Sequence, residues 1–289
     1  MYQCYYLSVA GITIRFDADC EILLSEEFLP FINKENVPDI HATIRMAVND
    51  SKIPENPLYS DMFCAVARNS AGHLQKFFYG DNSATGGCVV STYDVDNKHI
   101  LIEYPLSYAD KDLHLRSCFY WIGFESYLLQ KSKLCLHASF IDTHLGGILF
   151  SGASGIGKST QAELWCRYRS ARQINGDRPI LSKENDGWIA WGSPNAGSSR
   201  CYVNENSTVA AIVLLKQASM CTLRRLNPSE AFRGIWSGLT IRSWDPTFVD
   251  AASILAMDLV ANVPVYEFCC TPDEQAVNFL EEELRRGCL

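Results

Sequence analysis

The stretch from Gly152 to Ser159 constrains the fold of this chain more than any other. It reads G-A-S-G-I-G-K-S and lies between an apolar run at residues 148–150, typical of a buried strand, and a segment at residues 158–170 that favours a helix. Glycine allows a loop to turn tightly enough for several backbone N–H groups to converge on one anion. The following helix N-terminus adds about half a positive charge at the same point. The stretch therefore predicts a phosphate-binding loop.

The pattern G-x4-G-K-[ST] also assigns roles to single residues. Lys158 is expected to contact the β- and γ-phosphates of ATP, and the Ser159 hydroxyl to bind Mg²⁺. The alternative is a glycine-rich turn that binds nothing, but the pattern should occur by chance in only roughly one chain of this length in a hundred. We therefore predict nucleotide binding, with ATP and Mg²⁺ as ligands. The predicted binding residues are Gly152, Ala153, Ser154, Gly155, Ile156, Gly157, Lys158, Ser159 and Thr160.

Composition narrows the class of protein. The formal net charge of −8 argues against nucleic acid as a partner, because a phosphate backbone requires a basic surface. No apolar run is long enough to span a membrane, and the first residues do not resemble a secretory signal. The 12 cysteines are dispersed without a C-x-x-C pair, which favours buried reduced thiols over disulfides or zinc. We expect a cytoplasmic protein with neither a membrane nor a nucleic-acid partner.

The first part of the chain is predicted to be β-rich and antiparallel. Three pairs of apolar runs flank turn signals, the first at Ala10-Gly11. A helix is predicted from Leu113 to Lys131, and we place a domain boundary near residue 112. This gives a β-rich N-terminal module at residues 1–112 and a nucleotide-binding domain at residues 113–289. Packing, oligomerisation and substrate capture all stay open as roles of the first module, and a homo-oligomer is one of the expectations.

The second part is predicted to contain a mixed sheet rather than a regular βαβ alternation. Asn185-Asp186-Gly187 is a strong hairpin signal between two β-rich segments. Asp245 and Pro246 are typical of an N-cap and first helical residue, and the helix that they begin is expected to end near Asn262. The predicted strands lie at residues 148–150, 178–181, 188–191, 209–215 and 265–270.

Three residues outside the loop are candidates for chemistry. Asp177 follows the predicted helix and could hold a metal or orient an attacking hydroxyl. Arg200 ends a long loop of small residues and could pair with a transferred phosphoryl group. His137 could stabilise charge or relay a proton. The alternatives are a surface turn for Asp177, a plain connecting loop for Arg200, and a hydrogen-bonded core histidine for His137.

From residue 134 onward the chain resembles the kinase domain of HPr kinase/phosphorylase, a family that shares its nucleotide core with the phosphoenolpyruvate carboxykinases. The residues that carry the resemblance are Leu136-His137-Ala138-Ser139, Asp142, the glycine-rich loop, Gly176-Asp177-Arg178 and Gly192-Ser193-Pro194. The resemblance implies an α/β fold, α+β over the whole chain, with a carboxykinase-like P-loop domain behind the smaller β-rich one. It also implies that His137 is functional. The family has two adjacent aspartates where this chain has only Asp177.

These observations predict an ATP- and Mg²⁺-dependent kinase that phosphorylates a hydroxyl, for example a serine, on a protein, peptide or small molecule. The expected catalytic residues are Asp177, His137, Lys158 and Arg200, and the expected metal ligands are Ser159 and Asp177. Whether Asp177 acts as base, metal ligand or both stays open. The alternatives are a nucleotide sensor that does not transfer phosphate, and a small carboxykinase-like enzyme, for which 289 residues is short.

Overall fold

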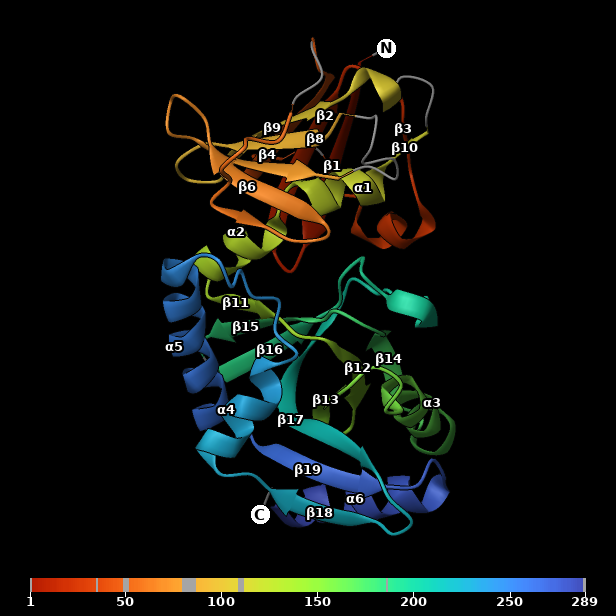
Figure 1. Ribbon diagram of the computed structural model, residues 1–289. Coiled ribbons are helices and arrows are strands. Elements are labelled where there is room, and N and C mark those ends of the chain that lie inside the picture. The colour runs from red at the N-terminus through yellow and green to blue at the C-terminus, as the bar shows by residue number, and fades with distance from the viewer. Residues whose placement is uncertain are drawn as a thin grey trace. The chain divides into compact units, whose positions relative to one another are not determined.

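The computed structural model describes residues 2–34, 36–48, 52–79, 87–108, 112–185 and 187–287. The chain divides into two compact units, Met1–Tyr127 and Leu128–Leu289 (Figure 1). This division lies farther along the chain than the boundary that we predicted near residue 112. The reason is that helix α1 (Leu115–Trp121) is bonded to the first unit, since the carbonyl of Trp121 accepts hydrogen bonds from Ser91 Oγ (2.8 Å) and Tyr93 Oη (3.0 Å).

The first unit is built on an eight-stranded sheet with the strand order β1-β2-β4-β9-β8-β7-β6-β5. A separate parallel pair joins β3 (Ile22–Leu23) to β10 (Leu113–His114). Two short 3₁₀ helices, η1 (Glu26–Phe31) and η2 (Leu106–Tyr108), lie in the connections. The strands of the large sheet are β1 (Gln3–Val9), β2 (Ile12–Ala18), β4 (Ile40–Met46), β5 (Tyr59–Ser60), β6 (Cys64–Arg68), β7 (Leu74–Phe78), β8 (Val89–Tyr93) and β9 (His99–Tyr104).

The three predicted hairpins are present as β1–β2, β6–β7 and β8–β9. The prediction of a purely antiparallel sheet was wrong, because β4 pairs parallel with both β2 and β9. We had not predicted β4. Because β4 runs in the same direction as its neighbour β2, the chain between them returns to the end of the sheet at which β2 begins.

The predicted helix at residues 113–131 is interrupted. It forms α1 and a second short helix, α2 (Phe124–Gln130), which are separated at Gly123. Gly123 has a φ of +60°, a left-handed conformation that ends a right-handed helix. The apolar and aromatic residues whose spacing predicted one continuous helix are therefore divided between two helices.

The second unit is built on a nine-stranded mixed sheet. Its long central strand, β17 (Asn206–Gln217), pairs antiparallel with β16 (Gly187–Trp191) near its start. Farther along, β17 pairs parallel with β13 (Gly146–Ser151) on one side and β19 (Val265–Cys270) on the other. The remaining strands are β11 (Lys133–Cys135), β12 (Ala138–Thr143), β14 (Arg172–Asn175), β15 (Ile180–Glu184) and β18 (Thr222–Arg225).

These pairings confirm the predicted mixed sheet and its strands, except that the strand predicted at residues 178–181 is β15, which begins at Ile180 and ends at Glu184. The pairing of Glu184 with Gly187 closes the β15–β16 hairpin at the predicted turn, of which Asp186 lies outside the described residues. The helix predicted after the glycine-rich loop is α3 (Lys158–Arg169), and the helix that Asp245 was predicted to cap is α5 (Pro246–Asn262). The Asp245 side chain accepts a hydrogen bond from Phe248 N, as an N-cap should.

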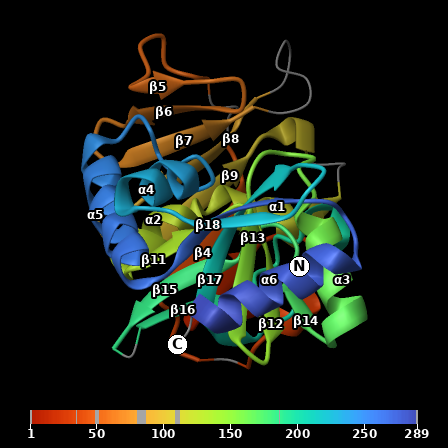
Figure 2. The same ribbon diagram turned by 90° about the horizontal axis from the view of Figure 1, so that it is seen from below.

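Helices cover both faces of the second sheet (Figure 2). On one face, α4 (Pro228–Trp236) and α5 share a core with side chains such as Phe140 and Ile212. On the other, α3 and α6 (Glu274–Gly287) enclose the fully buried Trp165 together with Phe150. This arrangement of helices on both faces explains why the middle of each strand, residues 148–150 in β13 and 209–215 in β17, is apolar. Within the described residues, no helix is both long and apolar enough to cross a membrane.

One buried carboxylate makes the stability of the first unit depend on pH. The side chain of Asp17 is only 6% exposed, and it lies 2.9 Å from Arg15 Nε and 2.6 Å from His41 Nε2. Burial alone would raise the pKa of Asp17, but the contacts from Arg15 and His41 lower it to about 2. The folded state therefore binds the proton more weakly than the unfolded chain does. The stabilisation is present above the ordinary carboxyl pKa of about 3.9 and is lost as the pH falls toward 2.

We predict that Asp17→Asn lowers the free energy of unfolding of the first unit at pH 7, and that the deficit shrinks at pH 2.5. Denaturant titrations of both proteins at each pH measure this difference. Asp96→Asn is the matched control, because the Asp96 side chain is 68% exposed. A deficit of equal size at both pH values would contradict the prediction.

Candidate active site

The predicted phosphate-binding loop joins the end of β13 to the start of α3. Gly157 is the N-cap of α3 and has a φ of +112°, which L side chains rarely adopt. Gly152 has a φ of +140°, and a Cβ there would lie 3.3 Å from Ile156 Cγ2 and 3.4 Å from the Leu215 carbonyl oxygen. The tight turn predicted from the sequence therefore requires glycine at both ends.

Several N–H groups of the loop are available to an anion. Ile156 N donates to Ala153 O at 3.3 Å and so is used inside the loop. In the part of the chain that the structure describes, no main-chain carbonyl accepts a hydrogen bond from the N–H of Gly155 or Gly157. The N–H groups of Lys158 and Ser159 belong to the first turn of α3, where a helix supplies no acceptor. These donors can bind phosphate oxygens.

The Lys158 side chain stabilises the loop through hydrogen bonds to its main chain. The residue is buried, and its Nζ donates to the carbonyl oxygens of Gly152 (3.0 Å) and Ala153 (3.1 Å). Burial lowers the pKa of Lys158, while the Asp177 carboxylate acts in the opposite direction and Arg178 lowers it further. The ammonium thus shares one electrostatic environment with Asp177 and Arg178, which come from a different part of the chain.

Strand register places His137 beside the loop. Ala138 pairs with Ser151 across the β12–β13 hairpin, so His137 lies opposite Gly152, the first residue of the loop. The main chain of His137 is held on both sides: its N–H donates to Gly238 O (2.8 Å), and its carbonyl accepts from Ser151 Oγ (2.9 Å). The hairpin therefore explains why a histidine so far ahead of the loop in sequence lies next to it in space.

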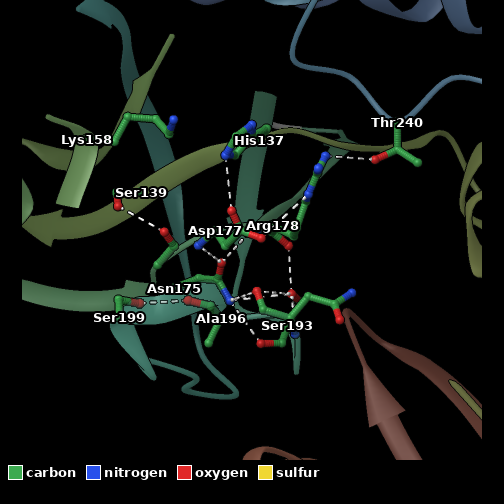
Figure 3. Close-up of polar contacts among 12 residues, drawn as sticks. His137, Ser139, Lys158, Asn175, Asp177, Arg178, Ser193, Ala196, Ser199 and Thr240 are labelled. Atoms are coloured by element: carbon green, nitrogen blue, oxygen red, sulfur yellow. Dashed lines mark hydrogen bonds and ion pairs between the residues drawn. The ribbon is translucent and has the colours of Figure 1, made fainter. Parts of the chain in front are cut away.

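The same sheet brings Asp177 to His137. Strand β14 pairs with β12 on the side opposite β13, and Ala138 N donates to Asp177 O at 3.0 Å. His137 Nε2 lies 3.1 Å from Asp177 Oδ1, and both side chains are about one-third exposed (29% and 31%). Figure 3 shows this pair, with Lys158 and Arg178 drawn on either side of it. Two predicted catalytic residues are thus in direct contact.

The charge state of His137 follows from its neighbours. Burial lowers the pKa of His137, the cations Lys158 and Arg178 lower it further, and Asp177 partly offsets them. The imidazole is therefore neutral at neutral pH, since its ordinary pKa is already about 6.5. A neutral imidazole can donate one hydrogen bond and accept another.

Asn175 fixes the turn that carries Asp177. We had not predicted this role of Asn175 from the sequence. Its Oδ1 accepts hydrogen bonds from the N–H groups of Asp177 (3.0 Å) and Arg178 (2.8 Å). Its Nδ2 donates to the carbonyls of Ser193 (2.9 Å) and Asn195 (3.2 Å). Asn175 is completely buried. No sequence signal distinguishes such a residue, because asparagine before glycine is common in ordinary turns.

The loop at residues 192–200 packs against this turn. A Cβ added to Gly197 would lie 2.9 Å from Asp177 Cβ, and a Cβ on Gly176 would collide with Ser199 Oγ. This loop of small residues therefore approaches Asp177 and its turn closely. Arg200 itself is exposed, and its side chain makes no ion pair or hydrogen bond to the described residues. Among the four predicted catalytic residues, contacts and charges connect Asp177, His137 and Lys158 but not Arg200.

Two of the predicted site residues, Ser159 and Asp177, carry oxygen atoms that could bind a metal. Among the described residues, no group of three or more histidine, cysteine, aspartate or glutamate side chains could hold a metal ion. Mg²⁺ typically binds one or two protein oxygens together with substrate phosphates and water. The Ser159 hydroxyl, which is half-buried, and the Asp177 carboxylate fit this requirement.

Comparisons with known proteins show distant similarity to solved structures. No protein-family model and no curated protein sequence matches the chain. Among solved structures, the chain is similar to the Hpr(Ser) kinase/phosphatase from Coxiella burnetii, with 19% sequence identity and a TM-score of 0.32. The similarity covers 53% of this chain and 88% of that chain. A similarity of this degree gives no information about activity.

We predict that the His137 imidazole titrates below pH 6.5, and at a still lower pH in Asp177→Asn, because that change removes the charge that favours its protonated form. Proton–carbon NMR of the six histidines across a pH series measures both midpoints, with His137→Gln to assign the resonance. His73, which is exposed, serves as the internal control and should not respond to Asp177→Asn. A higher His137 midpoint in Asp177→Asn would show that the pair is not formed.

We predict that Asn175→Ala destabilises the second unit by about 1–3 kcal/mol, because it removes the partner of two N–H groups and of the Ser193 carbonyl. The free energy of unfolding, measured by denaturant titration, tests this. Asn185→Ala removes an exposed asparagine from the β15–β16 turn and should be nearly neutral. Equal effects of the two substitutions would argue against a structural role for Asn175.

Proposed function

We propose that this protein is an ATP- and Mg²⁺-dependent kinase that transfers the γ-phosphoryl group to a hydroxyl, with a carboxykinase-like P-loop domain as its catalytic unit. One observation carries the proposal. A glycine-rich loop with a buried lysine lies on the same sheet as a His137–Asp177 pair in direct contact, and strand pairing connects the two. A loop that only binds phosphate needs no such pair.

The donor side of the reaction is formed by the loop. The unpaired N–H groups would bind the phosphates, and the Lys158 ammonium would exchange its contacts with the Gly152 and Ala153 carbonyls for phosphate oxygens. Ser159 and Asp177 would hold Mg²⁺, which supplies positive charge to the polyphosphate when bound. Lys158 is well placed for this role because its ammonium, already partly desolvated, gains more from an anionic partner than an exposed one would.

The acceptor side is formed by Asp177 and His137. In the transfer step the bond between the γ-phosphorus and the bridging oxygen of ATP breaks, and its electron pair leaves on ADP. The acceptor oxygen forms a new bond to phosphorus and gives its proton to the Asp177 carboxylate. His137, neutral and 3.1 Å from Asp177 Oδ1, would orient this carboxylate by donating a hydrogen bond from Nε2.

The second candidate function is a nucleotide sensor that binds ATP without transferring phosphate. The observation that favours it is the single acidic residue, since Asp177 has to serve as both metal ligand and base where the resembling kinases divide these tasks between two aspartates. The two functions make the same prediction for binding and opposite predictions for transfer.

We predict that Lys158→Ala weakens binding of Mg·ATP by about tenfold or more, because it removes the cation from the loop, whereas Asp177→Asn retains binding and abolishes transfer. Calorimetry measures the first effect. Incubation with γ-labelled ATP and a panel of hydroxyl acceptors (free serine, serine-containing peptides and small alcohols) measures the second.

Absence of Mg·ATP binding by the unmodified protein would refute both candidate functions. Binding without transfer to any acceptor would favour the sensor. Arg167→Ala, on the last turn of α3 and away from the loop, is the control for general loss of positive charge from this helix.

A further inference from the structure

The stretch between β14 and β15 carries a second cation into the site. Arg178 follows Asp177, and its main chain is fixed on both sides: its N–H donates to Asn175 Oδ1 (2.8 Å), and its carbonyl accepts a hydrogen bond from Ser193 Oγ (2.6 Å). Asn175 and Ser193 are both buried. The guanidinium therefore extends from a turn whose main chain is held by two buried side chains.

The guanidinium reaches the connection between α4 and α5, on which Thr240 lies. Its Nη1 donates to Thr240 Oγ1 at 3.3 Å, and its Nε lies 3.7 Å from Asp177 Oδ2, too far for a hydrogen bond. Thr240 is itself anchored, because its N–H donates to Cys135 O at 3.0 Å. The Arg178 side chain is 36% exposed, so a ligand can reach it. A guanidinium has five N–H donors, and most of these are not used by the contacts just described.

The charge of Arg178 reaches the other members of the site. It lowers the pKa of both His137 and Lys158, although burial lowers each more. Lys158, Arg178 and the His137–Asp177 pair therefore lie within one field, around a single carboxylate. Such an excess of positive charge is costly in the free protein and favourable once a polyphosphate is bound.

We propose that Arg178, rather than Arg200, is the catalytic cation that contacts the transferred phosphoryl group. This inference rests on the proposed kinase function and adds a residue to it. As the bond to the ADP oxygen breaks and the bond to the acceptor oxygen forms, negative charge is spread over the equatorial oxygens of the phosphoryl group. Lys158 meets this charge from the loop side. Arg178 meets it from the side of Asp177, where the acceptor hydroxyl is bound, and its planar fork can contact two oxygens at once.

The experiment compares ground-state and transition-state binding. Calorimetry of Mg·ADP alone and of Mg·ADP with aluminium fluoride, which mimics the phosphoryl group in transfer, is carried out on the unmodified protein and on Arg178→Ala, Arg178→Lys, Thr240→Val and Arg200→Ala. We expect Arg178→Ala to weaken the aluminium fluoride complex about 100-fold or more while changing Mg·ADP binding by less than about threefold. Arg178→Lys should recover part of the loss, Thr240→Val should give a smaller loss of the same kind, and Arg200→Ala should have no effect.

A loss in Arg200→Ala with none in Arg178→Ala would overturn the assignment. So would an equal loss of both complexes in Arg178→Ala and Arg178→Lys with the fold retained by circular dichroism, since that pattern indicates ground-state binding alone. Failure of the unmodified protein to bind Mg·ADP would instead refute the proposed function itself. Binding of Mg·ADP without any aluminium fluoride complex would refute transfer while leaving nucleotide binding intact.

Discussion

The position of β12 between β13 and β14 is the constraint on which the site depends. Its pairing with β13 places His137 opposite the first residue of the glycine-rich loop, and its pairing with β14 places Asp177 against His137. A shift of one residue in either register would turn the side chains to the other face of the sheet. The apolar side chains of β12, among them Phe140 and Ile141, are completely buried in two different cores, which fixes both registers at once. The packing that fixes the strand registers therefore also fixes the positions of His137 and Asp177.

Electrostatics then decides what this geometry can do. Two cations and a neutral imidazole surround one carboxylate, and the burial of Lys158 makes its charge costly without a further anionic partner. Asn175 and Ser193 hold the main chain of Asp177 and Arg178 through hydrogen bonds. The turn that carries these two residues is therefore not free to move away from the other charges. Under the proposed function, this turn would present Asp177 and Arg178 to a polyphosphate in a fixed orientation.

The sequence was sufficient for the parts of this arrangement that are local. Gly152 to Ser159, the β15–β16 turn and the N-cap at Asp245 each follow from a few neighbouring residues with fixed conformational preferences. The features of the fold and the site that could not be predicted from the sequence depend on contacts between distant segments. Strand β4 joins the first sheet in parallel, a direction set by a long connection rather than by its own residues. Asn175 acts through groups on another loop, and the choice between Arg178 and Arg200 depends on which way a connecting turn faces.

The order in which the elements of the second unit follow one another in the sequence has a consequence for its folding during synthesis. The loop-bearing strand β13 is flanked by β17 and, beyond it, by β19, whose residues come near the end of the chain. Helix α6, which closes the core around Trp165 of α3, comes later still. Contacts so distant in sequence form slowly, because the intervening chain must be ordered first. On the ribosome, the glycine-rich loop would therefore be synthesised well before β19 and α6, which complete its sheet and its core.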